Sequence, residues 1–246
     1  NNQLYFVPMF TAFITVLSQI NEDTPYFFDP NDVSPCIVAI SAFNIITVSI
    51  SSPDALQCLI GILNQYLWTQ GETGLEYGCL MALSQLSTAF LSEFLTLPQE
   101  DENYPTNILS KLFNEYILPD YSPRIKYVAL EAFRNFCTAS AKDMETDTQI
   151  LKTLLEILSS LDVIEVQISC LRTIKSFISY MREHVIGSIH MDCYEQFKQL
   201  ISECENEEVV ILLVKCIQKI YSKYHASDEV LTDLCKFLGE LYEAGV

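Results

Sequence analysis

Three histidines and nine cysteines are the residues of this 246-residue sequence whose types best suit metal binding or nucleophilic catalysis. His184, His190 and Cys193 lie close together, and imidazole and thiolate are ligands that zinc prefers. A fourth ligand at a suitable spacing is missing, and the sequence contains no HExxH, GxSxG, P-loop or GxGxxG motif. We therefore expect no metal site, no cofactor and no enzymatic activity.

The cysteines are scattered along the chain without a CxxC pair, mostly inside apolar helical patterns. That placement is typical of reduced thiols in a protein core, and disulfides are rare in the cytosol and the nucleus. The sequence also lacks an Asn-x-Ser/Thr sequon. We expect a cytoplasmic or nuclear protein, or one present in both compartments.

The chain is strongly acidic, with 14 Lys and Arg against 32 Asp and Glu and a formal net charge of −18. Nucleic-acid binding draws its affinity from Lys and Arg contacts to phosphate, so we expect no direct nucleic-acid partner. Basic proteins are better candidates, because opposite charge steers association.

The acidic excess is concentrated at the start of the chain, because residues 1–110 contain no Lys or Arg. Acidic surfaces often only keep a protein soluble, but this one also suits docking of a basic ligand, and the sequence leaves both open. The candidate basic-ligand residues are Glu22, Asp23, Asp29, Asp32, Glu72, Glu76, Glu93, Glu100, Asp101 and Glu102. The last three lie in residues 98–105 (PQEDENYP), which we expect to form an acidic loop between repeats.

Helices must position these charges, because apolar segments with helical periodicity alternate with short polar turns and no segment reads as a convincing strand. The expected helices span residues 4–20, 33–50, 55–68, 73–94, 106–118, 122–136, 147–161, 165–182, 191–204, 207–225 and 228–242. Residues 1–21 and 33–53 contain no charged side chain, but polar residues interrupt both segments and no Lys or Arg flanks them. They fit a buried inner layer of helices better than membrane insertion, which we do not expect.

A repeat emerges when the second helix of each expected pair is aligned on the segment 120–136. Ser122 and Pro123 suit the start of that helix. The aligned small or apolar anchors are Ala39, Cys79, Ala129, Cys170 and Leu213, at spacings of 40, 50, 41 and 43 residues. This period is typical of HEAT and armadillo arrays. It predicts an all-α fold, an α-solenoid of about five HEAT/armadillo-like helix pairs plus a terminal helix, over a compact helical bundle.

The order Asp120, Ile125-Lys126 and Ala129 resembles the HEAT signature of an acid, an aliphatic-basic pair and a small residue. Among HEAT proteins the chain most resembles a segment of the importin-β superfamily (karyopherins) of nuclear transport receptors, which are acidic, cysteine-bearing arrays. The resemblance implies binding of basic cargo, of a small GTPase and of Phe-Gly nucleoporin repeats. We expect residues 1–246 to form one solenoid segment of a longer protein, because the sequence opens without Met and directly in an apolar pattern.

Two other classes of function stay open on the sequence. One is a HEAT-repeat scaffold or assembly factor that holds the subunits of a multiprotein complex, and the other is an enzyme or the accessory arm of one.

The later second helices carry a set of basic residues. If these helices line the concave side, as in HEAT arrays, the set forms either internal ion pairs with Glu131, Glu165 and Glu208 or a second contact region of opposite sign. Its members are Lys126, Arg134, Arg172, Lys175, Lys215 and Lys219.

Gly61 and Gly78 fall inside expected helices. A helix-interior glycine costs about 1 kcal/mol relative to alanine. We expect both positions to permit close packing of a neighbouring helix.

Overall fold

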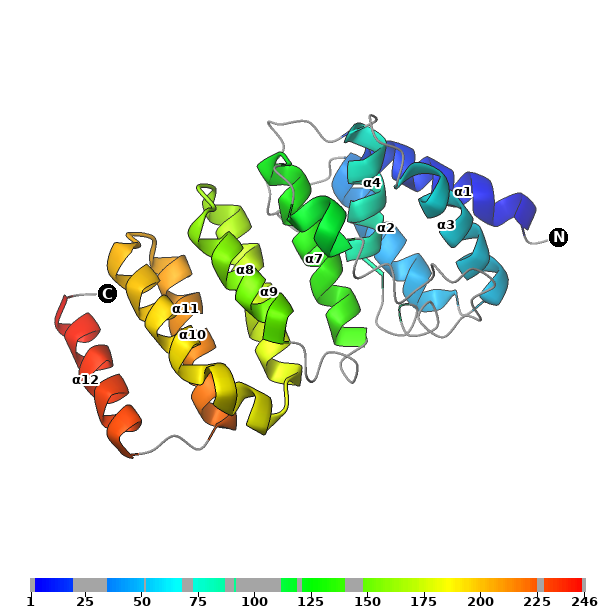
Figure 1. Cartoon of the computed structure of the whole chain (residues 1–246). Helices are drawn as coiled ribbons and strands as arrows, with labels where there is room; N and C mark the ends of the chain where they lie inside the picture. The colour runs from blue at the N-terminus through cyan, green and yellow to red at the C-terminus, as the bar shows by residue number, and fades with distance from the viewer. Residues whose placement is uncertain are drawn as a thin grey trace. The chain divides into compact units, whose positions relative to one another are not determined.

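A computed structural model of the chain describes most of its helical segments, and the described residues contain helices and no strand (Figure 1). They divide into two compact units, which we call unit 1 (Asn1–Ser140) and unit 2 (Ala141–Val246). The residues described are 3–19, 35–50, 52–67, 73–86, 91, 112–118, 121–139, 148–224 and 228–244. The expected loop at 98–105 lies outside them.

The described residues of unit 1 form three helix pairs that follow one another in sequence order. The first helices of the pairs are α1 (Gln3–Leu17), α3 (Pro53–Tyr66) and the π-helix η1 (Leu112–Ile117), and the second helices are α2 (Pro35–Ser49), α4 (Thr73–Ser84) and α7 (Pro123–Ala139). Among the first helices, α1 packs on α3. Among the second helices, α2 packs on α4 and α4 packs on α7. This is the stacking of an α-solenoid.

Unit 2 repeats the arrangement with two pairs and a further helix. Its elements are α8 (Thr148–Ser159), α9 (Ile164–Tyr180), α10 (Glu183–Glu203), α11 (Glu207–Lys223) and α12 (Asp228–Ala244). The first helices α8 and α10 pack on one another, and so do the second helices α9 and α11. The two units together confirm the predicted all-α fold of about five helix pairs and a terminal helix.

The predicted anchors lie in the core of both units. Ala129 and Cys170 are fully buried, and the remaining three anchors expose 6% or less of their surface. The large residues four positions further on, Phe43, Leu83, Phe133, Ile174 and Ile217, are buried as well. A side chain four residues on lies on the same helix face, so one alignment locates the buried face of every second helix.

The predicted end of α4 and the predicted start of α10 are wrong by the largest margin among the described helices, and a tertiary contact lies at each position. α4 ends at Ser84 instead of continuing to residue 94, and the side-chain amide of Asn135 on α7 donates a hydrogen bond to the Ser84 carbonyl. α10 begins at Glu183 instead of residue 191 and runs through Gly187. A Cβ at Gly187 would lie 3.0 Å from the Tyr224 ring, so the missing side chain makes room for that ring.

Gly61 and Gly78, for which the sequence predicts close helix packing, behave differently. A Cβ at Gly78 of α4 would lie 2.6 Å from the carbonyl oxygen of Ile14 in α1, so this glycine lets the two backbones approach, as predicted. A Cβ at Gly61 of α3 would meet nothing within 4 Å, so the packing prediction is wrong there.

Candidate protein-interaction surfaces

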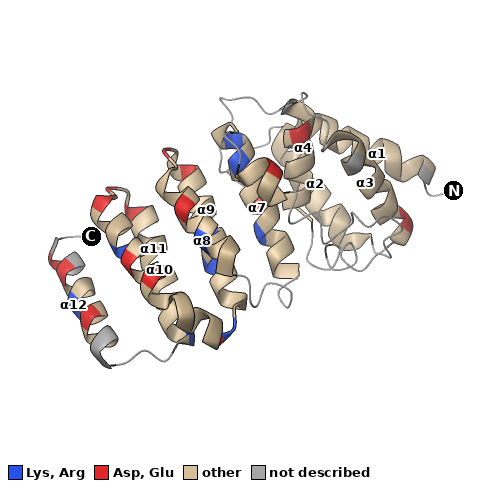
Figure 2. Cartoon of the chain, in the orientation of Figure 1, with Lys and Arg blue, Asp and Glu red and all other residues tan. Residues whose placement is uncertain are grey.

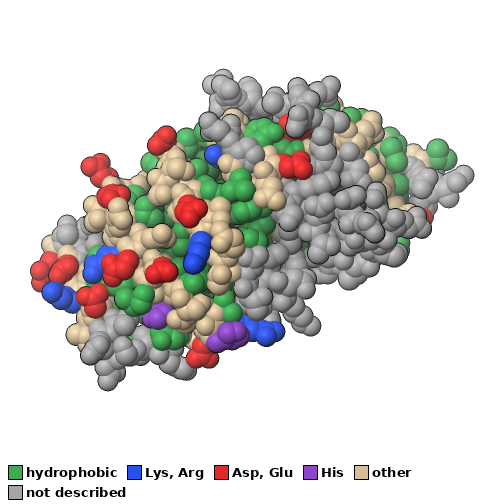
Figure 3. All heavy atoms as spheres, in the orientation of Figure 1, with side chains coloured by type: hydrophobic (Ala, Val, Ile, Leu, Met, Phe, Trp, Pro, Cys, Tyr) green, Lys and Arg blue, Asp and Glu red, His purple; other side chains and the backbone are tan. Residues whose placement is uncertain are grey.

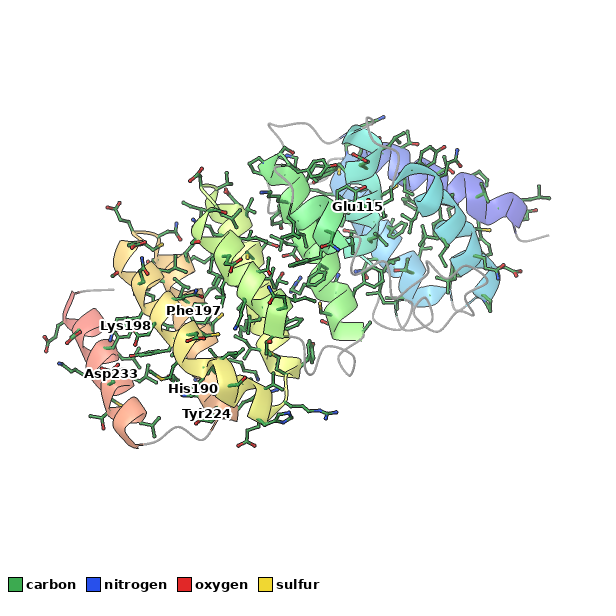
Figure 4. All side chains as sticks on the ribbon, in the orientation of Figure 1. Glu115, His190, Phe197, Lys198, Tyr224 and Asp233 are labelled. Atoms are coloured by element: carbon green, nitrogen blue, oxygen red, sulfur yellow. The ribbon has the colours of Figure 1, made fainter. Side chains whose placement is uncertain are left out.

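One predicted basic-ligand residue, Glu76, lies within the described part of the chain, and it is buried with 3% of its surface exposed. Its carboxylate on α4 accepts a hydrogen bond of 3.5 Å from the hydroxyl of Tyr116, which also donates to the carbonyl of Leu67. Burial raises the pKa of Glu76, and the nearby carboxylate of Glu115 on η1 (Figure 4) raises it further, against the effect of the Tyr116 hydrogen bond. Glu76 is therefore a structural carboxyl and offers no exposed charge to a ligand.

The other nine predicted acids lie outside the described residues, so an acidic docking surface stays a prediction. They are Glu22, Asp23, Asp29, Asp32, Glu72, Glu93, Glu100, Asp101 and Glu102. The described helices of unit 1 carry few charges, whereas Asp, Glu, Lys and Arg are frequent on the helices of unit 2 (Figure 2).

An apolar ridge is exposed on α2 in unit 1. Val38, Ile45 and Val48 expose 55%, 64% and 64% of their surface, while Phe43 on the opposite side of the same helix is fully buried. The helix contains no charged residue. Large exposed apolar residues on one helix face are typical of protein interaction sites.

A basic ridge runs along α9 and α11 in unit 2. Arg172 pairs with Glu208 across the two helices at 3.3 Å, and in unit 1 Arg134 pairs with Glu131, so internal ion pairing is confirmed for these two arginines. Lys175 lies close enough to the buried Cys216 of α11 to oppose the rise in its pKa, which burial brings to about 12. In the described residues Lys175, Lys215 and Lys219 have no carboxylate within ion-pair distance.

A cluster of aromatic and charged residues joins α10 to α12. The hydroxyl of Tyr194 donates to Asp233 at 2.7 Å, and the Lys198 ammonium lies 3.4 Å from the same carboxylate. Lys198 also lies over the rings of Tyr194 and Phe237 at 5.5 and 5.4 Å. The Tyr194 hydrogen bond lowers the pKa of Asp233. Lys198 of α10 and Asp233 of α12 point toward one another (Figure 4), so these groups hold α12 against α10.

The histidine and cysteine pair considered for metal binding serves packing. His190 lies in the middle of α10, where Nδ1 is 2.9 Å from the Gly187 carbonyl and the ring lies 4.1 Å from that of Tyr224. Cys193 is buried, and burial raises its pKa to about 12, so its thiol is protonated at neutral pH. Within the described residues, no three His, Cys, Asp or Glu side chains come together in a way that suits a metal ion.

Hydrophobic and charged side chains are interspersed on the face of unit 2 seen in Figure 3. Among the helices that the structure describes, none combines the length and apolarity that a membrane span needs.

Comparison with solved structures identifies chains of similar fold. A chain in the structure of a Kap95p–RanGDP complex, in which Kap95p binding induces the Ran switch loops to adopt the GTP-bound conformation, superimposes with a TM-score of 0.51 and 11% sequence identity. The match covers 97% of this chain and 34% of that chain, so the present sequence spans about a third of its length. The sequence matches no protein-family model and no curated protein. The likeness shows a karyopherin-like helical fold.

Proposed function

We propose that this chain is a protein-binding segment of a nuclear transport receptor and takes basic protein cargo on the acidic surface of residues 1–110. The observation that carries the proposal is the coincidence of two features. The fold resembles that of a karyopherin–Ran complex over 97% of the chain, and the first 110 residues contain 11 Asp and Glu with no Lys or Arg.

The proposed mechanism is electrostatic capture. A surface of one sign raises the rate at which a ligand of opposite sign associates, and salt weakens this attraction. The small GTPase Ran and Phe-Gly nucleoporin repeats are the further partners that a transport receptor implies, and the compartments are the cytoplasm and the nucleus. The solenoid supplies extended surface for such partners.

The test is the affinity of the chain for a fluorescent Lys/Arg-rich peptide, measured by anisotropy at about 0.1 M and about 1 M salt, where the Debye length is about 10 Å and about 3 Å. We expect binding at the lower concentration and a large loss at the higher one. A variant with Glu100, Asp101 and Glu102 changed to Gln and Asn should bind more weakly. A variant with Glu207, Glu240 and Glu243 of unit 2 changed to Gln loses the same charge and should bind like the wild type. Failure to bind at low salt would contradict the proposal.

A second candidate function, a scaffold that holds subunits of a stable complex, is favoured by the exposed ridge on α2. Permanent interfaces are more apolar than transient ones and depend less on salt. Purification of the parent protein from cells in about 1 M salt distinguishes the two, because charge-steered cargo should dissociate there and scaffold subunits should remain. Recovery of Ran in its GTP form at low salt would favour transport.

A further inference from the structure

The basic residues of unit 2 occupy equivalent positions in successive repeats. Arg172 and Lys215 each lie eight residues after the first residue of a 17-residue helix, α9 and α11. These two helices pack on one another. Lys175 follows Arg172 by one turn, and Lys219 follows Lys215 by one turn, so four cations form two adjacent rows.

Acidic residues are absent from these parts of the two helices. Residues 166–180 of α9 and 209–223 of α11 contain no Asp or Glu, in a chain whose net charge is −18. The acids of both helices lie in the first turns, at Glu165, Glu207 and Glu208. The helix dipole explains why acids lie in the first turn of a helix. It favours cations only in the last turn, and the four cations lie before the last turn of their helices, so the dipole does not explain them.

Structural roles account for Lys223 and partly for Arg172, but not for Lys175, Lys215 and Lys219. Lys223 donates to the carbonyl oxygens of Ser179 and Met181 and so caps the end of α9. Arg172 forms an ion pair with Glu208, and the Glu208 side chain is itself well exposed. Lys175, Lys215 and Lys219 form no ion pair with any carboxylate of the described helices.

The spacing suits a row of carboxylates. Packed helices lie about 8–10 Å apart, and residues one turn apart on a helix lie about 6 Å apart. Carboxylates on one face of a helical segment, or on alternate residues of an extended one, repeat at about 6–7 Å. An acidic segment crossing the two helices can therefore place its carboxylates opposite both rows.

The ridge also has an apolar component. Ile211 lies one turn before Lys215 on α11 and exposes 42% of its surface. A protein segment offers an apolar side chain to such a residue, whereas a nucleic-acid backbone offers none. The ridge thus favours an acidic peptide as its ligand.

We infer that the α9–α11 ridge is a binding site for an acidic segment of a protein partner, with carboxylates against Arg172, Lys175, Lys215 and Lys219 and an apolar side chain against Ile211. The site is separate from the proposed basic-cargo surface of residues 1–110 and opposite to it in charge. One chain of this kind can hold two partners of opposite charge.

The test is anisotropy of a fluorescent peptide of glutamates with a single leucine, titrated with the whole chain at about 0.1 M salt, where the Debye length of about 10 Å screens distant acids. We expect binding by the wild type and about fivefold weaker binding by K215Q/K219Q, since each exposed pair contributes modestly. Glutamine keeps the helix propensity, so the variant should fold, as circular dichroism can check.

The matched control is K152Q/K236Q, which removes two exposed lysines from α8 and α12 and should bind like the wild type. Equal weakening by the control would show a general charge effect and overturn the inference, and so would a wild type that does not bind. Tighter binding of an oligonucleotide, lost in K215Q/K219Q, would overturn the assignment to a protein partner.

Discussion

The two units build the same helix-pair stack with different chemistry. In unit 1, α1, α2 and α4 are apolar on almost every side, and α4 approaches the α1 backbone closely at Gly78. In unit 2 the helices have one apolar face and one charged face. Polar side chains also bind two helix ends there, Asn206 at the start of α11 and Lys223 at the end of α9.

The difference between the units separates the helix face that packs in both stacks from the faces that vary. Both units bury a small or apolar anchor and a large residue four positions later, so this buried face is what the two stacks share. The opposite faces are free to differ, and they do so in polarity and in charge. Function in a repeat protein resides on these variable faces.

The largest expected effect tests the shared buried face. Phe133→Ala in unit 1 and Phe177→Ala in unit 2 should each lower the free energy of unfolding by about 3–5 kcal/mol, because both rings are fully buried. Urea unfolding measures the loss. Ile45→Ala, at a residue that is 64% exposed, is the control and should change stability by less than about 0.5 kcal/mol. A control as harmful as Phe133→Ala would contradict the described orientation of α2.

The next effect sharpens the contrast between two glycines of unit 1. Gly78→Ala should destabilise the protein by about 1–3 kcal/mol, since the new Cβ meets the α1 backbone and overpacks the contact. Gly61→Ala should stabilise it by about 0.5–1 kcal/mol, because the site is open and alanine favours helix. Thermal unfolding measures both. Opposite signs support the described packing, and equal signs contradict it.

A smaller effect concerns the N-cap residues of two helices, α11 in unit 2 and α3 in unit 1. The Asn206 side chain accepts a hydrogen bond from the Val209 amide at 3.1 Å, so Asn206→Ala should cost about 1 kcal/mol. Ser52 occupies the same position before α3 without a side-chain cap bond, so Ser52→Ala should cost much less. Chemical denaturation of both variants makes the comparison. Similar losses would mean that Ser52 caps α3 in solution.

The smallest effect is a change in how stability depends on pH. The pKa of Glu76 is raised in the folded state, so the folded chain binds this proton more tightly than the unfolded chain does. The free energy of unfolding should therefore fall as pH rises from the ordinary value of 4.5 through the folded-state pKa. Glu76→Gln keeps an acceptor for Tyr116 and should remove this fall. Urea unfolding from about pH 4 to about pH 8 measures it, and parallel profiles for the two proteins would contradict a raised folded-state pKa of Glu76.

Much of the fold could be predicted from particular residues. Pro123 begins α7, as expected, and the alignment on Ala129 located buried residues as distant as Cys79 and Leu213. The end of α4 and the start of α10 could not be predicted, because the contacts that explain them come from Asn135 and Tyr224, which are remote in sequence.

The candidate sites were less predictable than the fold. Glu76 was placed among surface acids because it lies in an acid-only stretch, but it is buried against Tyr116, which lies 40 residues later. The basic residues of the second helices were recognised, but the sequence left open which of them are paired. The structure pairs Arg134 and Arg172 and leaves Lys215 and Lys219 on the ridge.

The sequence by itself determined the helical period, the buried anchors and the division of charge along the chain, because these depend on residue type and spacing within one helix or one repeat. Only the tertiary structure decided which charges reach the surface. Burial and ion pairing join residues such as Glu76 and Tyr116, or Arg172 and Glu208, which lie about one repeat apart. The stacking of helices brings them together, so their roles depend on the assembled repeats.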